Sequence, residues 1–90
     1  MADQSTPRWF RARTPAALGA ALRHVRRSRG LTQTELGDRI GASRPTVSRM
    51  DRGSETVSLG TVLDVVAECG FELIVVPRGS MLKVEFPEDQ

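Results

Sequence analysis

The residues best suited to binding chemistry lie between positions 43 and 53, in the run SRPTVSRMDRG. If this run forms a helix, Val47 and Met50 point to the core because they are three residues apart. The residues that remain on the outward face are Arg44, Pro45, Thr46, Ser48 and Arg49. Guanidinium groups bond the edge of guanine through two hydrogen bonds, and guanidinium and hydroxyl groups both contact phosphate. This pattern predicts a surface that reads DNA.

The run before it has the signature of a second short helix. Thr32 and Glu35 form a T-x-x-E capping box, which marks a helix start. Leu36 and Ile40 are four residues apart and share one face. Gly41 follows at the point where the chain must turn with a positive φ.

The helix after this turn begins at Ser43, a good N-cap, and ends at Gly53. Two short helices joined by a tight turn form the unit that places its second helix in the DNA major groove. The segment 31–53 is therefore predicted to be a helix-turn-helix.

This stretch resembles the helix-turn-helix of the XRE/Cro family, which includes the lambdoid phage repressors. The matching positions are Gln33, Leu36, Gly41, Val47 and Ser48, with the approach R-x-x-R-G-L-T-Q from Arg26 to Gln33. Two positions depart from the family pattern: Gly37 replaces the usual Ala, and Asp51 replaces the more usual Glu. The resemblance implies a mainly α, lambda-repressor-like bundle of four to five helices, and it implies that Gln33 anchors to phosphate.

Each candidate DNA contact has an expected role. Arg44 is the first choice for reading a base, because an arginine on guanine is the commonest specific contact. Ser43, Thr46 and Ser48 are suited to short contacts with bases or phosphate, and Pro45 to a thymine methyl group. Arg49 and Arg52 are expected to contact phosphate. Two further candidates, Arg26 and Arg27, either reach phosphate or stabilise the end of their own helix.

The remaining segments divide the chain into four parts. Residues 1–13 are predicted to be a flexible basic arm, 14–70 the DNA-binding domain, 71–86 a strand or hairpin for dimerisation, and 87–90 a disordered tail. Within 14–70 a first helix begins at Thr14 and ends at Gly30, and a fourth runs from Ser58 to about Cys69. The residues of the fourth helix predicted to face the core are Leu59, Val62, Leu63 and Val66.

The segment 71–76, FELIVV, is a strand by composition and is stopped by Pro77. A lone strand leaves backbone groups unpaired, so it must pair with residues 81–86 as a hairpin or with its copy in a second subunit. The two pairings are compatible, since a hairpin still has an exposed edge. The residues expected at such a dimer contact are Phe71, Leu73, Ile74, Val75 and Val76.

The run from Ser58 to Val75, SLGTVLDVVAECGFELIV, resembles the HipB-type antitoxins. In that group C-terminal strands of two subunits form a small intermolecular sheet. The resemblance implies a homodimer that binds a palindromic operator in double-stranded DNA, neutralises a HipA-like kinase toxin and represses the operon encoding both proteins.

The composition of the chain favours some classes of function over others. Residues 1–30 carry seven arginines and one acid, whereas residues 54–90 carry two basic residues and seven acids, so DNA should face the N-terminal half.

One His, one Cys and no Tyr leave little material for a catalytic triad or a metal cluster, so we expect no enzyme activity, no metal and no cofactor. The single cysteine and the lack of a long apolar run suggest a cytoplasmic protein without membrane contact or small-molecule substrate. The rival functions are a stand-alone regulator without a toxin and an adaptor that does not bind DNA.

Overall fold

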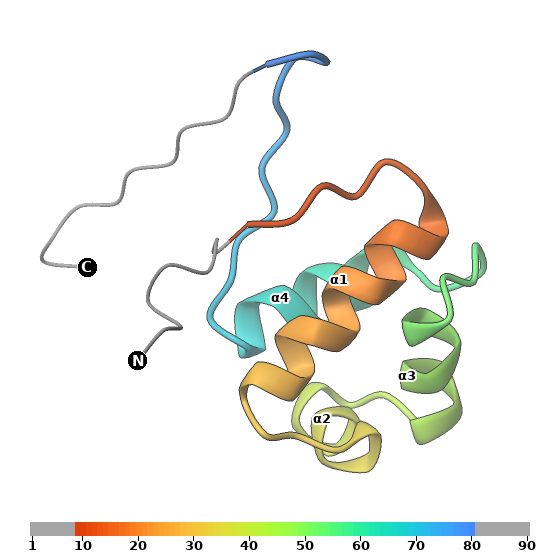
Figure 1. Cartoon of the computed structure of the whole chain (residues 1–90). Helices are drawn as coiled ribbons and strands as arrows, with labels where there is room; N and C mark the ends of the chain where they lie inside the picture. The colour runs from red at the N-terminus through yellow and green to blue at the C-terminus, as the bar shows by residue number, and fades with distance from the viewer. Residues whose placement is uncertain (1–8, 81–90) are drawn as a thin grey trace, which may run out of the picture.

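Four helices form in the part of the chain that the structure describes, residues 9–80 of a computed structural model (Figure 1). They are α1 (Pro15–Ser28), α2 (Gln33–Ile40), α3 (Arg44–Asp51) and α4 (Leu59–Glu68). This confirms the mainly α fold and the two helices predicted within segment 31–53. Most of the predicted basic arm, the second half of the predicted hairpin (81–86) and the tail 87–90 lie outside the described residues.

Each helix begins at a hydroxyl residue. The side chains of Thr14, Thr32, Ser43 and Ser58 each accept a hydrogen bond from a backbone N–H three residues later. At α2 the capping box is complete, because the Thr32 N–H also donates to Glu35 Oε1 at 2.8 Å. These bonds satisfy N–H groups that a helix start leaves free, which is why the sequence signals located all four starts.

The turn between α2 and α3 depends on two glycines. Gly41 ends α2 in the left-handed conformation, with φ 73°. Gly37 lies where the α2 backbone passes the following segment, and a Cβ built on it would overlap the Ala42 carbonyl oxygen. Glycine at position 37, where the family usually has Ala, therefore matches a close backbone contact in this chain.

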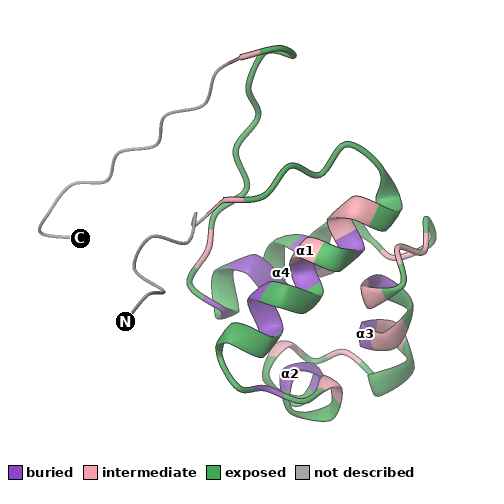
Figure 2. Ribbon diagram, viewed as in Figure 1, coloured by how far each residue is buried: buried purple, intermediate pink, exposed green. Residues whose placement is uncertain are grey.

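All four helices contribute side chains to the core. Figure 2 shows the buried residues on the facing sides of the helices. α1 contacts α3 and α4, and α2 contacts α3 and α4. The buried apolar side chains are Leu22, Val25, Leu31, Leu36, Val47, Met50, Val62, Val65, Val66 and Cys69. The expected burial of Leu36, Val47 and Met50 is confirmed, while Ile40 is half-buried.

The prediction for α4 was half wrong. Val62 and Val66 are buried as expected, but Leu59 is 66% exposed and Leu63 is 44% exposed. The buried stripe of this helix also contains Val65 and Cys69. At about 100° per residue, the centre of that stripe lies roughly 70° from Leu59 and 110° from Leu63. Sequence alone did not distinguish the two faces because both carry apolar residues.

α1 and the end of α3 approach so closely that side chains are excluded between them. A Cβ on Gly19 would come within 2.6 Å of both the Gly53 nitrogen and the Met50 carbonyl oxygen. A Cβ on Gly53 would come within 2.7 Å of the Ala16 Cα. This contact brings the backbone of α1 directly against the last turn of α3.

Residues 71–76 leave the bundle after α4. Phe71 packs against the core, whereas Leu73, Ile74, Val75 and Val76 are exposed, with Val75 at 93%. No strand occurs within residues 9–80, so the predicted C-terminal strand is not confirmed. A reverse turn then follows, in which the Ser80 N–H donates to the Pro77 carbonyl at 3.2 Å and Gly79 has φ 86°.

Candidate nucleic-acid interface

The outward face of α3 carries the residues predicted to read DNA. Arg44, Pro45 and Arg49 are exposed, and Thr46 and Ser48 are half-buried. No described residue covers the guanidinium of Arg44 with an ion pair or a hydrogen bond. This leaves its donors available to a ligand.

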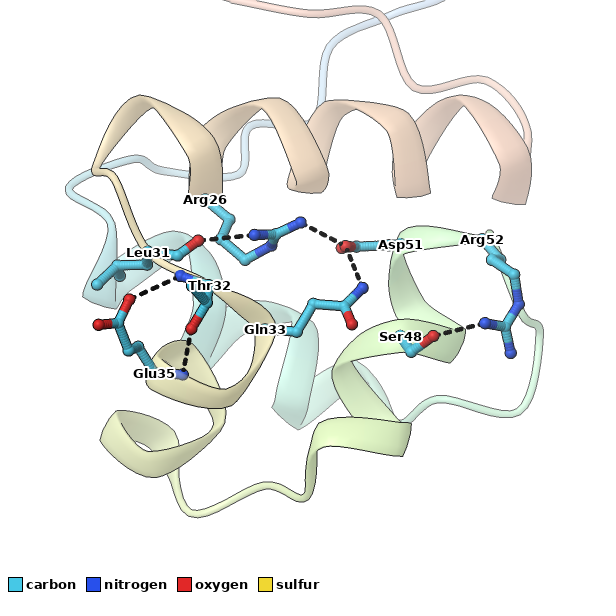
Figure 3. A network of polar contacts seen from close by, with 8 residues as sticks. All are labelled: Arg26, Leu31, Thr32, Gln33, Glu35, Ser48, Asp51 and Arg52. Atoms are coloured by element: carbon cyan, nitrogen blue, oxygen red, sulfur yellow. Dashed lines mark hydrogen bonds and ion pairs between the residues drawn. The ribbon is translucent and has the colours of Figure 1, made fainter.

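Hydroxyl groups hold part of this face in place. Ser43 Oγ lies 3.0 Å from Thr46 Oγ1, and Arg49 Nη2 donates to Thr46 Oγ1 at 3.3 Å. On the neighbouring side, Arg52 Nη1 donates to Ser48 Oγ at 2.5 Å (Figure 3). The two arginines near the end of α3 are thus oriented by hydroxyl groups one turn earlier in the helix.

Arg26 occupies a different environment from the one expected. It was a candidate for phosphate contact, but its side chain is only 7% exposed. Its Nη2 donates to Asp51 Oδ2 at 2.9 Å, and its Nη1 donates to the Leu31 carbonyl at 2.6 Å (Figure 3). Because both ends of the guanidinium bind groups within the fold, we remove Arg26 from the candidate DNA contacts and assign it to the internal structure.

Gln33 joins the same cluster from the first position of α2. Its Nε2 donates to Asp51 Oδ2 at 3.1 Å, so one carboxylate oxygen accepts from both α1 and α2. The Asp51 side chain is 5% exposed, and its Oδ1 is buried without a hydrogen-bond partner among the described residues. The sequence marked Asp51 only as a mild departure from the family pattern. The structure makes it the residue that joins the first three helices.

Two other arginines of α1 remain at the surface, Arg23 and Arg27. Together with Gln33, Ser48 and Arg52 they line an open hollow of about 370 Å³ between α1, α2 and α3. The Arg26–Asp51 pair also borders this hollow. Arg23 is not among the DNA contacts predicted from the sequence. The signal that would have found it is its spacing from Arg27, because residues four apart share one helix face.

Arg29, at the end of α1, binds within the fold as well. Its Nε donates to the Cys69 carbonyl at 2.8 Å, which satisfies a carbonyl group at the end of α4. Cys69 itself is fully buried, as expected, and this burial raises the pKa of its thiol. The thiol is therefore less readily ionised than an exposed cysteine, which makes it a packing residue.

The charge at the start of α2 is also set by local hydrogen bonds. The Thr32 backbone N–H bonded to Glu35 lowers the pKa of that carboxyl group, and the Thr32 hydroxyl lowers it further. Glu35 is therefore held in its ionised form, which complements the positive end of the helix dipole.

No group of three or more His, Cys, Asp or Glu side chains within residues 9–80 is arranged to hold a metal ion. No described helix has the length and apolar character required to cross a membrane.

Residues 17–76 match the helix-turn-helix domain family. The chain is also 32% identical over 73 residues to y4mF of Sinorhizobium fredii (strain NBRC 101917 / NGR234), an uncharacterized HTH-type transcriptional regulator, covering 81% of this chain and 96% of that protein. The chain therefore belongs to the helix-turn-helix family, and the class that its fold and surface define is an HTH-type transcriptional regulator.

Several solved structures have a similar fold. HipB in a HipA–HipB–O2–O3 complex superimposes with a TM-score of 0.69 at 23% identity, covering 78% of this chain and 99% of HipB. The clp gene regulator ClgR from Corynebacterium glutamicum gives a TM-score of 0.59 at 34% identity, covering 64% of this chain and 62% of ClgR. A toxin-antitoxin module from Streptococcus pneumoniae gives a TM-score of 0.57 at 36% identity, and the match covers 71% of this chain and 70% of the chain from that module. The fold is thus HipB-like, as predicted.

Proposed function

We propose that this protein is a sequence-specific transcriptional repressor that binds a palindromic operator as a homodimer. The observation that carries the proposal is the outward face of α3, where Arg44 has no competing partner among the described residues and Arg49 is oriented by Thr46. Two copies of α3 in one dimer would enter successive major grooves about one helical turn, or ~34 Å, apart. This role requires no catalytic group.

Some of the candidate DNA contacts would provide specificity and the others affinity. Arg44, at the first position of the helix, would read a base, and Ser43, Pro45, Thr46 and Ser48 would add short contacts. Gln33, Arg27, Arg49 and Arg52 would contact phosphate, which adds affinity without selecting a sequence. The first turn of the recognition helix is the part that contacts base edges in helix-turn-helix proteins.

Operator binding by variants tests this division. Arg44→Ala should cost about 1–3 kcal/mol and relax specificity at one operator position, because it removes a two-bond contact to a base. Arg49→Ala should weaken operator and random DNA alike. Gel-shift titrations of both variants on the DNA upstream of the gene, with a shuffled duplex as control, measure the difference. If both variants weaken operator and random DNA equally, the proposed roles are wrong.

We further propose that the protein is the antitoxin of a type II toxin-antitoxin pair and that its partner is a HipA-like kinase. Two likenesses support this: the HipB fold, shared at 23% identity, and a toxin-antitoxin module that is 36% identical. The alternative is a stand-alone regulator, which is favoured by the similarity to ClgR at 34% identity.

A pull-down with the tagged chain distinguishes these two functions. Stoichiometric recovery of a kinase supports the antitoxin, whereas recovery of DNA and the chain alone supports the stand-alone regulator. An adaptor would show no preference for its upstream DNA in the gel-shift titrations. We also propose that the protein is cytoplasmic, because a repressor must reach DNA.

A further inference from the structure

The hollow between α1, α2 and α3 has the chemistry of an anion site. We propose that it seats one phosphate of the DNA backbone and that Arg23, which the sequence pattern did not select, is one of its ligands. The inference rests on the proposed DNA binding and extends it from the face of α3 to a defined point on the flank of the domain. The hollow measures about 370 Å³ and is open to solvent.

The charge around the hollow favours an anion. Four guanidinium groups border the hollow, on Arg23, Arg26, Arg27 and Arg52, against a single carboxylate, Asp51. That carboxylate is already used, because Arg26 and Gln33 both donate to its Oδ2. Within residues 9–80, Arg23, Arg27 and Arg52 form no ion pair. Three uncompensated positive charges thus face one small volume, an arrangement that favours a phosphate.

Two of the donors around the hollow are already held in place. Arg52 is held by Ser48 Oγ, and the amide of Gln33 is held by Asp51. Each side chain keeps further N–H donors beyond the one already used. Because these donors are positioned before binding, less conformational entropy is lost when a phosphate arrives. The bonds formed would be charge-assisted and so stronger than neutral ones.

The position of the hollow also suits a phosphate of the DNA backbone. The hollow adjoins the first residue of α2 and the last turn of α3, beside the face predicted to enter the major groove. When a recognition helix lies in the groove, the preceding helix crosses the DNA backbone. A phosphate is therefore the group of the duplex expected beside this hollow, and the bases lie farther away.

The salt dependence of DNA binding tests the proposal. A plot of the logarithm of the DNA-binding constant against the logarithm of the salt concentration has a negative slope. Each lost phosphate contact makes this slope shallower by about 1. We expect this reduction for Arg23→Gln and none for Arg78→Gln. Arg78 is also an exposed arginine, in the 77–80 turn, and it does not line the hollow. A slope that is unchanged in Arg23→Gln, or reduced equally in both variants, would overturn the proposal.

Using a random duplex beside the upstream DNA separates this inference from the proposed function. Phosphate contacts act on both duplexes, whereas base reading acts on one. If the wild-type protein shows no preference for the upstream DNA, but Arg23→Gln still reduces the salt dependence of binding, only the proposal of sequence-specific repression is overturned. If neither duplex binds the wild-type chain, the proposed function and the phosphate site both fail.

A second measurement identifies the source of the phosphate. Duplexes carrying one neutral methylphosphonate at successive positions are titrated with wild type and with Arg23→Gln. At one position in the duplex, the methylphosphonate should weaken the binding of the wild-type protein. It should leave the binding of Arg23→Gln unchanged, since that variant has already lost the contact to this phosphate. If no position behaves in this way, and inorganic phosphate at millimolar concentration shifts the Arg23 signals in NMR spectra, the hollow binds free anions and the assignment to DNA is wrong.

Discussion

At the scale of single residues, glycine positions fix how the helices meet. Gly19 lies where the backbone of α1 meets the end of α3, and a Cβ there would overlap backbone atoms of Met50 and Gly53. Gly60 in α4 is different, because the only atom near its Cβ position is Ser58 Oγ at 3.9 Å. The same substitution should therefore have opposite effects at the two positions.

Gly19→Ala is expected to lower the free energy of unfolding by about 1–3 kcal/mol, because overlapping backbone atoms must move apart. Gly60→Ala is expected to raise it by about 0.5–1 kcal/mol, because alanine loses less backbone entropy in a helix. Urea denaturation followed by circular dichroism measures both values. A neutral or stabilising Gly19→Ala would show that the close α1–α3 approach is not needed for the fold.

The capping box of α2 makes a pH-dependent contribution. Hydrogen bonds from Thr32 lower the pKa of Glu35, so its stabilising effect is complete above the ordinary glutamate pKa of about 4.3. It is lost as the pH falls through the lowered value in the folded state. Glu35→Gln keeps an acceptor for the Thr32 N–H but cannot titrate. This variant should lose less stability than the wild type in thermal melts between pH 7 and pH 3, and equal losses would contradict the assignment.

At the scale of the helices, one buried ion pair joins α1 to α3. Arg26 and Asp51 are 7% and 5% exposed, and Gln33 adds α2 to the same carboxylate. The chain between Arg26 and Asp51 contains the whole of α2 and nearly all of α3. The pair therefore fixes the orientation of the proposed recognition helix relative to the rest of the domain.

Removing one partner should be costly because the other becomes an unpaired buried charge. We expect Arg26→Met and Asp51→Leu, each as a single variant, to destabilise the fold by about 3–5 kcal/mol. The double variant Arg26→Met, Asp51→Leu should lose clearly less than the sum of the two single variants, since it leaves no such charge. Chemical denaturation of the three variants gives the coupling energy. Additive losses would mean that the two side chains contribute independently.

At the scale of the whole molecule, the exposed apolar tract 73–76 is the segment proposed for the dimer contact. The turn that follows it does not favour pairing with residues 81–86. Gly79 has a positive φ and Arg78 does not, so the turn is not one of the primed types that match the twist of a two-residue hairpin. Pro77, at the first position of the turn, also has no N–H to donate. Both observations favour pairing with a second copy of the chain.

Val75→Asp tests this contact without disturbing the bundle. Val75 is 93% exposed, so the variant should fold with an unchanged unfolding free energy in its monomeric form. It should, however, shift the protein from dimer to monomer in sedimentation experiments and weaken operator binding. Arg78→Gln serves as a control for altered charge in the same segment. A dimeric Val75→Asp variant would exclude this segment as the main dimer contact.

Local signals in the sequence located much of the fold. The hydroxyl residues that start the helices and the glycines that end α2 and α3 act on backbone groups within a few residues, so their effect can be inferred from spacing alone. The outward face of α3 was predicted for the same reason. Its helical period is fixed once Val47 and Met50 are assigned to the core.

The tertiary structure decided the features that depend on distant parts of the chain. Arg26 and Asp51 are 25 positions apart, so the burial of Arg26 became visible only when α1 and α3 packed together. The exposed position of Leu59 and Leu63 was decided by which of two apolar faces of α4 fits the other helices. The sequence by itself determined where helices begin and end and which residues α3 presents. Packing determined which charges are buried, because burial depends on contacts that local spacing does not encode.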